Sequence, residues 1–201
     1  MSMVAQRLNA DLAALVEKAE RSLVQVRDGG RGIGAGTIWH PEGLIVTNAH
    51  VVSGSHLRVV LPNRTTVAAQ VLAYDADLDL AALAVNAASL PTIEVGNSRD
   101  LKPGQLVLAI GHPWGVLGAV VTGVIIGVGS DLPEMPRSQQ EWVLASLRLR
   151  PGHSGGPLLD VHGRLVGVNT MIAGPNIGMA VPVHVIKAFL RGTVGTLRVA
   201  T

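Results

Sequence analysis

The chain has 201 residues, of which 48% are hydrophobic, 15% charged and only 2% aromatic, with a formal net charge of +2. So much apolar surface on a nearly neutral chain excludes intrinsic disorder, and the absence of cysteine excludes disulfides, thiolate metal sites and a cysteine nucleophile. No basic tract with interleaved aromatic residues occurs, so nucleic acid is not an expected partner.

Residues 1–22 are predicted to form an N-terminal helical segment. Its apolar positions recur three or four residues apart, as on one face of a helix, at Leu8, Leu12, Leu15, Val16 and Ala19. The segment lacks the apolar core of a signal peptide, so no export signal is predicted in it.

After Arg21 the chain changes to short apolar runs rich in Val and Ile, separated by Gly, Pro, Asn and Asp. This spacing predicts an all-β sandwich or barrel. The uncharged stretch Pro113–Gly129 is shorter than the roughly 20 residues a membrane-spanning helix needs, and it predicts two buried strands joined by a tight turn. A short helix is predicted at Pro182–Arg191, a surface loop at 132–141, and a seam between two halves near 89–104.

The segment Gly152–Pro157 places Ser154 between glycines in a tight turn. Glycines leave room for backbone N–H groups to converge beside the serine hydroxyl, as an oxyanion site requires. Ser154 is therefore a candidate nucleophile, although an ordinary Gly-rich hairpin turn has the same composition.

A general base and an orienting carboxylate have one candidate each. His50 closes an apolar strand, where a histidine can be a general base or a satisfied core residue. Asp79 directly precedes the apolar run 80–85, so its carboxylate is expected at the rim of the core, where it can accept an imidazole N–H. The aspartates at 75–79 also suggest a calcium loop, but Leu80 stands where that loop needs glycine.

The order His50, Asp79, Ser154, with the histidine in TNAHVV and the serine in GHSGGPL, resembles the chymotrypsin-like serine proteases and, within them, the HtrA (high-temperature-requirement) family. Segments 11–26, 32–38, 78–85, 109–115 and 176–190 share the resemblance. It implies an all-β fold of two packed six-stranded β-barrels, with an N-terminal helix and a short C-terminal helix. The trypsin-like protease domain would span 23–191, followed by a tail at 192–201.

The resemblance implies a serine endopeptidase that cleaves unfolded or flexible polypeptides through an acyl-enzyme. No cofactor or metal is expected, because the sequence has no His, Asp and Glu cluster with the spacing of metal ligands. His50 would be the base, Asp79 its orienting partner and Ser154 the nucleophile, with Gly152, His153 and Ser154 forming the oxyanion hole. Two other hypotheses are a non-proteolytic chaperone or scaffold that binds peptides on the same fold, and an acyl hydrolase acting on esters.

The resemblance also implies a substrate pocket whose apolar walls would favour small or aliphatic side chains before the scissile bond. Its residues would be Leu149, Thr170, Met171, Ile172, Gly178, Met179 and Ala180. Arg148 and Arg150 flank Leu149, so a turn shifted by one residue would instead place a guanidinium in the pocket and favour acidic side chains.

Family resemblance further suggests a homotrimer and a bacterial periplasmic or other extracytoplasmic location. PDZ domains usually follow the protease domain in this family, but only eleven residues follow Leu190 here. Regulation by such a domain is therefore not expected in this chain.

Overall fold

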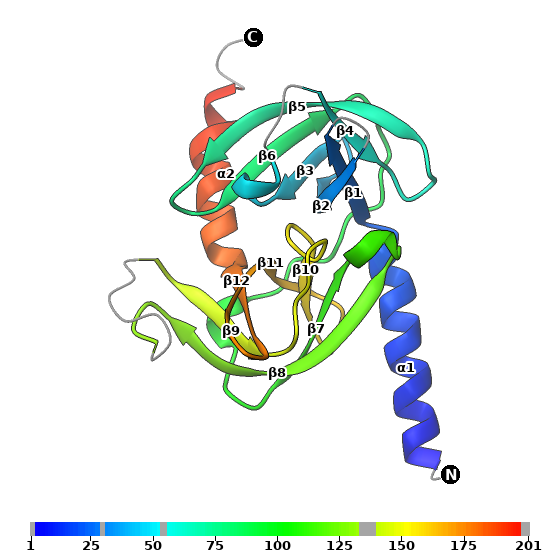
Figure 1. Ribbon diagram of the computed structural model, residues 1–201, viewed down its shortest axis with the longest axis vertical. Coiled ribbons are helices and arrows are strands. Elements are labelled where there is room, and N and C mark those ends of the chain that lie inside the picture. The colour runs from blue at the N-terminus through cyan, green and yellow to red at the C-terminus, as the bar shows by residue number, and fades with distance from the viewer. Residues whose placement is uncertain (1–2, 29–30, 53–55, 133–139, 198–201) are drawn as a thin grey trace.

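The computed structural model describes residues 3–28, 31–52, 56–132 and 140–197, which form two barrels and two main helices (Figure 1). The first barrel is closed in the order β1-β2-β3-β6-β5-β4, with every neighbouring pair antiparallel. Its strands are β1 (Leu23–Asp28), β2 (Arg31–His40), β3 (Leu44–Thr47), β4 (Leu57–Val60), β5 (Thr66–Asp75) and β6 (Leu80–Val85).

The second barrel is closed in the order β10-β11-β12-β9-β8-β7 and is also antiparallel throughout. Its strands are β7 (Leu106–Gly111), β8 (Ala119–Gly129), β9 (Trp142–Ser146), β10 (Pro157–Asp160), β11 (Leu165–Gly174) and β12 (Ile177–Pro182). The predicted pair of six-stranded barrels is thus confirmed. Residues 86–105 connect them and include the 3-10 helix η2 (Ser98–Asp100).

Aliphatic side chains fill both barrels, as the scarcity of aromatic residues requires. The core of the first barrel includes Val24, Ile38 and Leu83, and that of the second includes Ile125, Val143 and Leu158. Burying each such side chain stabilises the fold by about 1.5–3 kcal/mol relative to exposure.

The C-terminal helix α2 (Val183–Leu197) packs against both barrels, contacting β5 and β6 of the first and β11 and β12 of the second. Ile186 and Leu190 of α2 share one apolar cluster with Leu80 of the first barrel and Val181 of the second. The helix begins where the sequence predicts but continues past the expected end at Arg191, so the predicted tail is partly helical.

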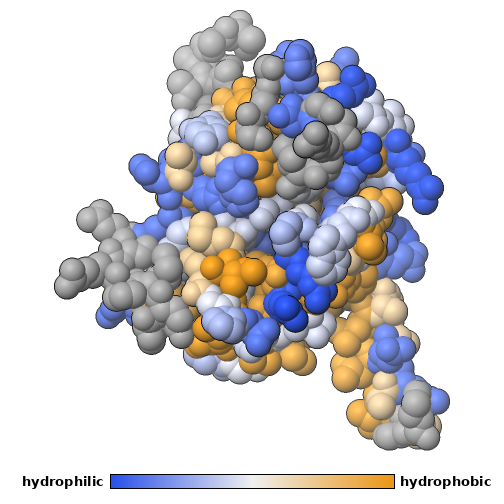
Figure 2. Space-filling view, in the orientation of Figure 1, coloured by the Kyte–Doolittle hydropathy of each residue, from blue (hydrophilic) through white to orange (hydrophobic). Residues whose placement is uncertain are grey.

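The N-terminal helix α1 (Met3–Glu20) projects from the body along one side (Figure 1). Its second half packs on the second barrel through Leu12, Leu15, Val16 and Ala19. Met3, Val4 and Leu8 are exposed, and apolar side chains follow the projecting helix on the surface (Figure 2). Among the described residues, none of the helices has the length and apolar character needed to cross a membrane.

The two strands predicted within Pro113–Gly129 are wrong. A 3-10 helix, η3 (Pro113–Gly115), is followed by the single strand β8. Gly123 lies inside β8 and not in a turn. The position requires glycine because a Cβ there would overlap the Ser146 carbonyl of the neighbouring strand β9. Most of the surface loop predicted at 132–141 lies outside the described residues.

Candidate active site

The ring of His50 is hydrogen-bonded to the carboxylate of Asp79 in the first barrel. The Nδ1 atom of His50 lies 2.9 Å from both carboxylate oxygens of Asp79, and the backbone N–H of His50 donates to Oδ1 at 3.1 Å. β3 ends at Thr47, so His50 lies in the 3-10 helix η1 (Ala49–Val51) and does not close the strand as predicted. His50 follows the end of β3 and Asp79 precedes the start of β6, and because these two strands are antiparallel both residues lie at the same end of the pair.

Asp79 is buried, and its carboxylate is held by several donors. Burial raises the pKa of Asp79, but hydrogen bonds from the His50 ring, the Thr170 hydroxyl and the His50 backbone outweigh it and lower the pKa below its ordinary value. Asn48 donates its side-chain N–H to the Asp79 carbonyl at 3.0 Å. The carboxylate is therefore charged at neutral pH and fixes the orientation of the His50 ring.

Ser154 lies in the turn that leads into β10. Its carbonyl accepts the N–H of Ala35 at 2.8 Å, which ties the turn to the first barrel. Gly155 must be glycine, because its φ is +83° and a Cβ would overlap the Ala35 carbonyl and the Thr47 hydroxyl. The Ser154 hydroxyl donates to the Thr170 carbonyl at 2.8 Å.

The serine turn and the histidine helix meet at β2. A Cβ added to Gly34 would lie 2.7 Å from a methyl of Val51, the residue after His50, and 2.9 Å from the Ser154 carbonyl oxygen. The three candidate triad residues are therefore gathered at the junction of the barrels. Among the described residues, Nε2 of His50 and the Ser154 hydroxyl share no hydrogen bond.

The backbone N–H groups of two buried histidines hold the turn at 150–154 in place. The N–H of His153 donates to the Arg150 carbonyl at 2.9 Å, and the N–H of His112 donates to the Gly152 carbonyl at 2.8 Å. The backbone N–H groups of Gly152 and Ser154 make no hydrogen bond within the described part of the chain. Those two N–H groups are free to receive a ligand oxygen, whereas that of His153 is already used.

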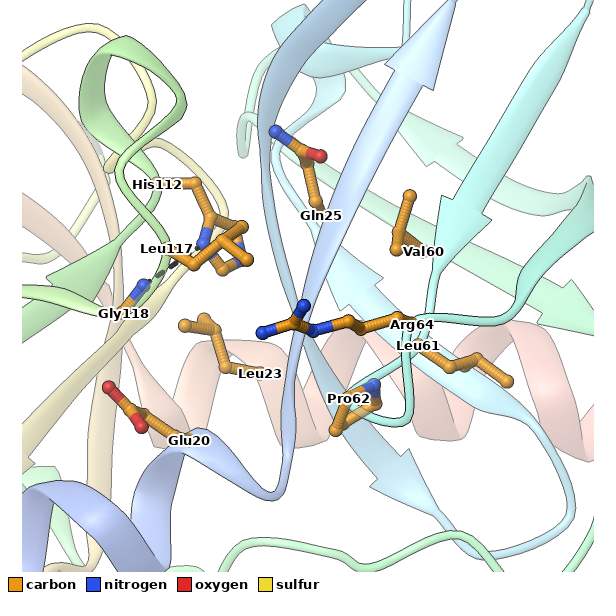
Figure 3. Close-up of a pocket in the computed structure, with 10 residues that line it drawn as sticks. All are labelled: Glu20, Leu23, Gln25, Val60, Leu61, Pro62, Arg64, His112, Leu117 and Gly118. Atoms are coloured by element: carbon orange, nitrogen blue, oxygen red, sulfur yellow. Dashed lines mark hydrogen bonds between the residues drawn. The ribbon is translucent and has the colours of Figure 1, made fainter.

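His112 also lines a cavity of about 220 Å³ between α1, β1, the β4–β5 turn and the start of β8 (Figure 3). Its Nδ1 atom accepts the N–H of Gly118 at 3.2 Å. Burial lowers the pKa of His112 to about 4, outweighing the nearby Val24 carbonyl, and burial likewise lowers the pKa of His153. Both rings are thus neutral at pH 7, and the cavity is separate from Ser154.

The predicted pocket residues fall into two groups. Leu149, Thr170, Gly178, Met179 and Ala180 are buried, whereas Met171 and Ile172 are half exposed on β11. A Cβ on Gly178 would lie 3.0 Å from Cγ of Leu149, so these two residues are in contact range. The β11–β12 register is irregular between Asn169 and Ile172.

The two arginines beside Leu149 are more exposed than it is. Arg148 is exposed, and the guanidinium of Arg150 lies 4.6 Å from the centre of the Trp114 ring in η3. Leu149 is the buried member of the three.

Comparison with known proteins identifies the family. The model of the trypsin-like peptidase domain matches residues 34–168, which include His50, Asp79 and Ser154. The chain belongs to the trypsin-like peptidase family. Within it the chain is of the HtrA type, as its relatives and structural neighbours are.

Two relatives illustrate the match. Protease Do-like 1, chloroplastic, from Arabidopsis thaliana is 41% identical over 166 residues, which are 78% of this chain and 38% of that protein. A probable periplasmic serine endoprotease DegP-like from Halomonas elongata is 37% identical over 161 residues, 77% of this chain and 34% of that protein. The chain thus spans well under half the length of either relative.

The fold is also that of a solved HtrA-type structure. The HtrA-type protease AlgW with decapeptide superposes with a TM-score of 0.80 at 26% identity, covering 91% of this chain and 67% of that one.

Sequence reasoning missed the polar residues that support the three candidates. Thr170 was predicted only as a residue of the substrate pocket, and the bond from its hydroxyl to Asp79 was not foreseen. Asn48 and Asn169 are buried and bind backbone carbonyls, Asn169 at Gly156 and Pro157. The one available signal was a polar residue inside an otherwise apolar run.

Proposed function

We propose that this HtrA-type chain is a serine endopeptidase in which His50, Asp79 and Ser154 form the catalytic triad. The observation that carries the proposal is the His50–Asp79 contact at 2.9 Å, placed beside a serine turn with two unused N–H groups. A histidine whose Nδ1–H is held by a buried carboxylate presents its Nε2 as a proton acceptor.

The reaction begins when the Ser154 hydroxyl turns from the Thr170 carbonyl toward Nε2 of His50. As Oγ bonds to the peptide carbonyl carbon, its proton passes to Nε2, and the imidazolium is stabilised by Asp79. His50 then gives that proton to the leaving amine as the C–N bond breaks. Water attacks the resulting ester by the same route and frees the serine.

The oxyanion of each tetrahedral intermediate would lie between the N–H groups of Gly152 and Ser154. A single donor of this kind is typically worth about 10²- to 10³-fold in rate. His153 supports the turn through its bonds to Arg150, while its own N–H stays engaged.

Leu149 and Gly178 support a shallow apolar pocket for a small or aliphatic side chain before the scissile bond. The irregular register at Thr170 and Met171 leaves backbone available for pairing with an extended substrate strand. Unfolded or flexible polypeptides, which can adopt that extended form, are the substrate class we propose. The protease domain would span residues 23–191.

Two further proposals extend from the relatives. The periplasmic name of the Halomonas relative and the chloroplastic name of the Arabidopsis relative favour an extracytoplasmic location. A homotrimer is the assembly we propose from the family resemblance, and the exposed apolar residues at the start of α1 offer a surface for contacts between its copies. A non-proteolytic chaperone is the second candidate, and intact His50, Asp79 and Ser154 argue against it.

The test compares the wild-type enzyme with Ser154→Ala. We expect a fluorophosphonate probe to label only the wild type, and unfolded casein to be cleaved only by it. An equal rate of casein cleavage by both proteins would overturn the assignment of Ser154. Binding of casein by both without any cleavage would favour the chaperone.

A further inference from the structure

The order of strands in the second barrel places two surfaces on opposite sides of the Ser154 turn. The turn leads into β10, which lies between β7 and β11. Thr170 belongs to β11, and η3 with Trp114 directly follows β7. A substrate that pairs with β11 before its scissile bond therefore leaves the site toward η3.

η3 borders the oxyanion turn directly. A Cβ on Gly152 would lie 2.8 Å from the Cα of Pro113, so no side chain separates Gly152 from η3. Trp114, the next residue, is 71% exposed and adopts a left-handed backbone with φ of 54°. Such a conformation is uncommon for a bulky residue, and it persists where surrounding structure requires it.

Arg150 completes this surface. Its guanidinium stacks on the Trp114 ring at 4.6 Å, which orients the group while its in-plane N–H donors stay available. Arg150 is only half buried, and within the described part of the chain neither Arg150 nor Arg148 forms an ion pair with a carboxylate. Asp79, the carboxylate of the site, is engaged by His50 and Thr170.

An oriented guanidinium on an aromatic platform, with no carboxylate partner among the described residues, suits the carboxylate of an extended chain. We propose that Trp114 and Arg150 form a subsite that receives an acidic side chain, Asp or Glu, on the C-terminal side of the scissile bond. This inference rests on the proposed function, and it assigns the acidic preference to that side of the bond and not to the pocket at Leu149.

The experiment uses pairs of fluorogenic peptides that differ only by Glu or Gln at one of the first three positions after an alanine or valine cleavage site. We expect Glu to be preferred about three- to tenfold in kcat/KM at one position, less so at high salt. Arg150→Gln should abolish the preference. Arg148→Gln, which removes the other arginine beside Leu149, is the matched control and should retain it.

Trp114→Asn tests the platform, because asparagine tolerates the left-handed backbone but has no ring. We expect it to reduce the preference, whereas Trp114→Phe should preserve most of it. Thermal unfolding of each variant checks that the fold is retained.

Binding of the same peptides to Ser154→Ala, measured by fluorescence anisotropy, reads the subsite without any cleavage. A preference for Glu in binding that disappears in Ser154→Ala/Arg150→Gln supports the subsite, whether or not the wild type hydrolyses any peptide. A failure of the wild type to hydrolyse the peptides would count against the proposed function alone. Equal binding and equal cleavage of Glu and Gln peptides would overturn the subsite. So would a preference that Arg148→Gln removes as completely as Arg150→Gln does.

Discussion

The hydroxyl of Thr170 donates a hydrogen bond to Oδ2 of Asp79, a residue 91 positions earlier in the chain. The carbonyl of the same threonine accepts the Ser154 hydroxyl. One residue of the second barrel thus contacts both the orienting carboxylate of the first barrel and the candidate nucleophile.

Replacing Thr170 by valine should lower kcat/KM about tenfold. Valine keeps the shape of threonine but removes the hydroxyl donor to Oδ2 of the buried Asp79, which leaves His50 as the remaining side-chain donor and costs about 1–3 kcal/mol. Thr170→Ser, which restores the hydroxyl, should recover most of the activity. Peptide hydrolysis measured alongside the free energy of unfolding separates these effects, and a Thr170→Ser variant as impaired as Thr170→Val would contradict the role of the hydroxyl.

Asp79→Asn should reduce kcat by about 10⁴-fold. The amide cannot accept two hydrogen bonds from His50 and one from Thr170 as the carboxylate does, so the ring loses the tautomer that exposes a basic Nε2. Steady-state kinetics on a small aliphatic peptide substrate would measure the loss. Asp77→Asn, at an exposed position of the same turn, should leave kcat within a factor of about two, and a comparable loss there would refute the assignment of Asp79.

Gly155→Ala should prevent formation of the serine turn. Its Cβ would overlap the Ala35 carbonyl and the Thr47 hydroxyl. Gly104 has a similar φ of +88° but open space around it, so Gly104→Ala isolates the backbone strain, which costs about 1 kcal/mol. We expect Gly104→Ala to remain folded and active. Gly155→Ala should lose both the cooperative unfolding transition, followed by circular dichroism, and labelling by the fluorophosphonate.

The buried His112 should make the free energy of unfolding depend on pH. Its folded pKa of about 4 lies below the ordinary value of 6.5, so between these values the unfolded chain binds a proton that the folded protein excludes. Stability is therefore greatest above pH 6.5 and falls by up to about 3 kcal/mol as the pH drops toward 4. His153 acts in the same direction.

Urea unfolding at pH 7 and pH 4.5 would measure this dependence. His112→Asn keeps an acceptor for the Gly118 N–H but cannot take up the proton, so its stability should change less with pH. His162→Gln, at an exposed position, should behave as the wild type does. The lowered pKa of Asp79 does not affect the difference in unfolding free energy between pH 7 and pH 4.5. The stability that Asp79 contributes is lost only as the pH falls below the ordinary value of 3.8.

Much of the fold could be predicted from the sequence, because most strands are continuous apolar runs ended by Gly, Pro, Asn or Asp. The run 80–85 coincides with β6. β8 could not be predicted in this way. Its glycines resemble turn residues, and the close approach of β9, which requires glycine at 123, is visible only in the folded structure.

The sequence indicated three candidate residues and the contact between His50 and Asp79, but not the other contacts that surround them. His50, Asp79 and Ser154 each belong to a recognisable motif. The roles of Thr170 and Asn48 depend on partners far away in the chain, and no local pattern encodes such a partner. The orientation of Arg148 and Arg150 likewise depends on the packing of Leu149 against Gly178 and on the Trp114 ring.

The candidate site is divided between two barrels, so the distances between its residues depend on how the barrels pack against each other. His50 and Asp79 belong to the first barrel and Ser154 to the second, so a small rotation between intact barrels would separate the proposed base from the proposed nucleophile. Helix α2 is inserted into the apolar seam that opposes this rotation, through Ile186 and Leu190. The relative position of the candidate residues thus depends on apolar contacts made by the C-terminal helix.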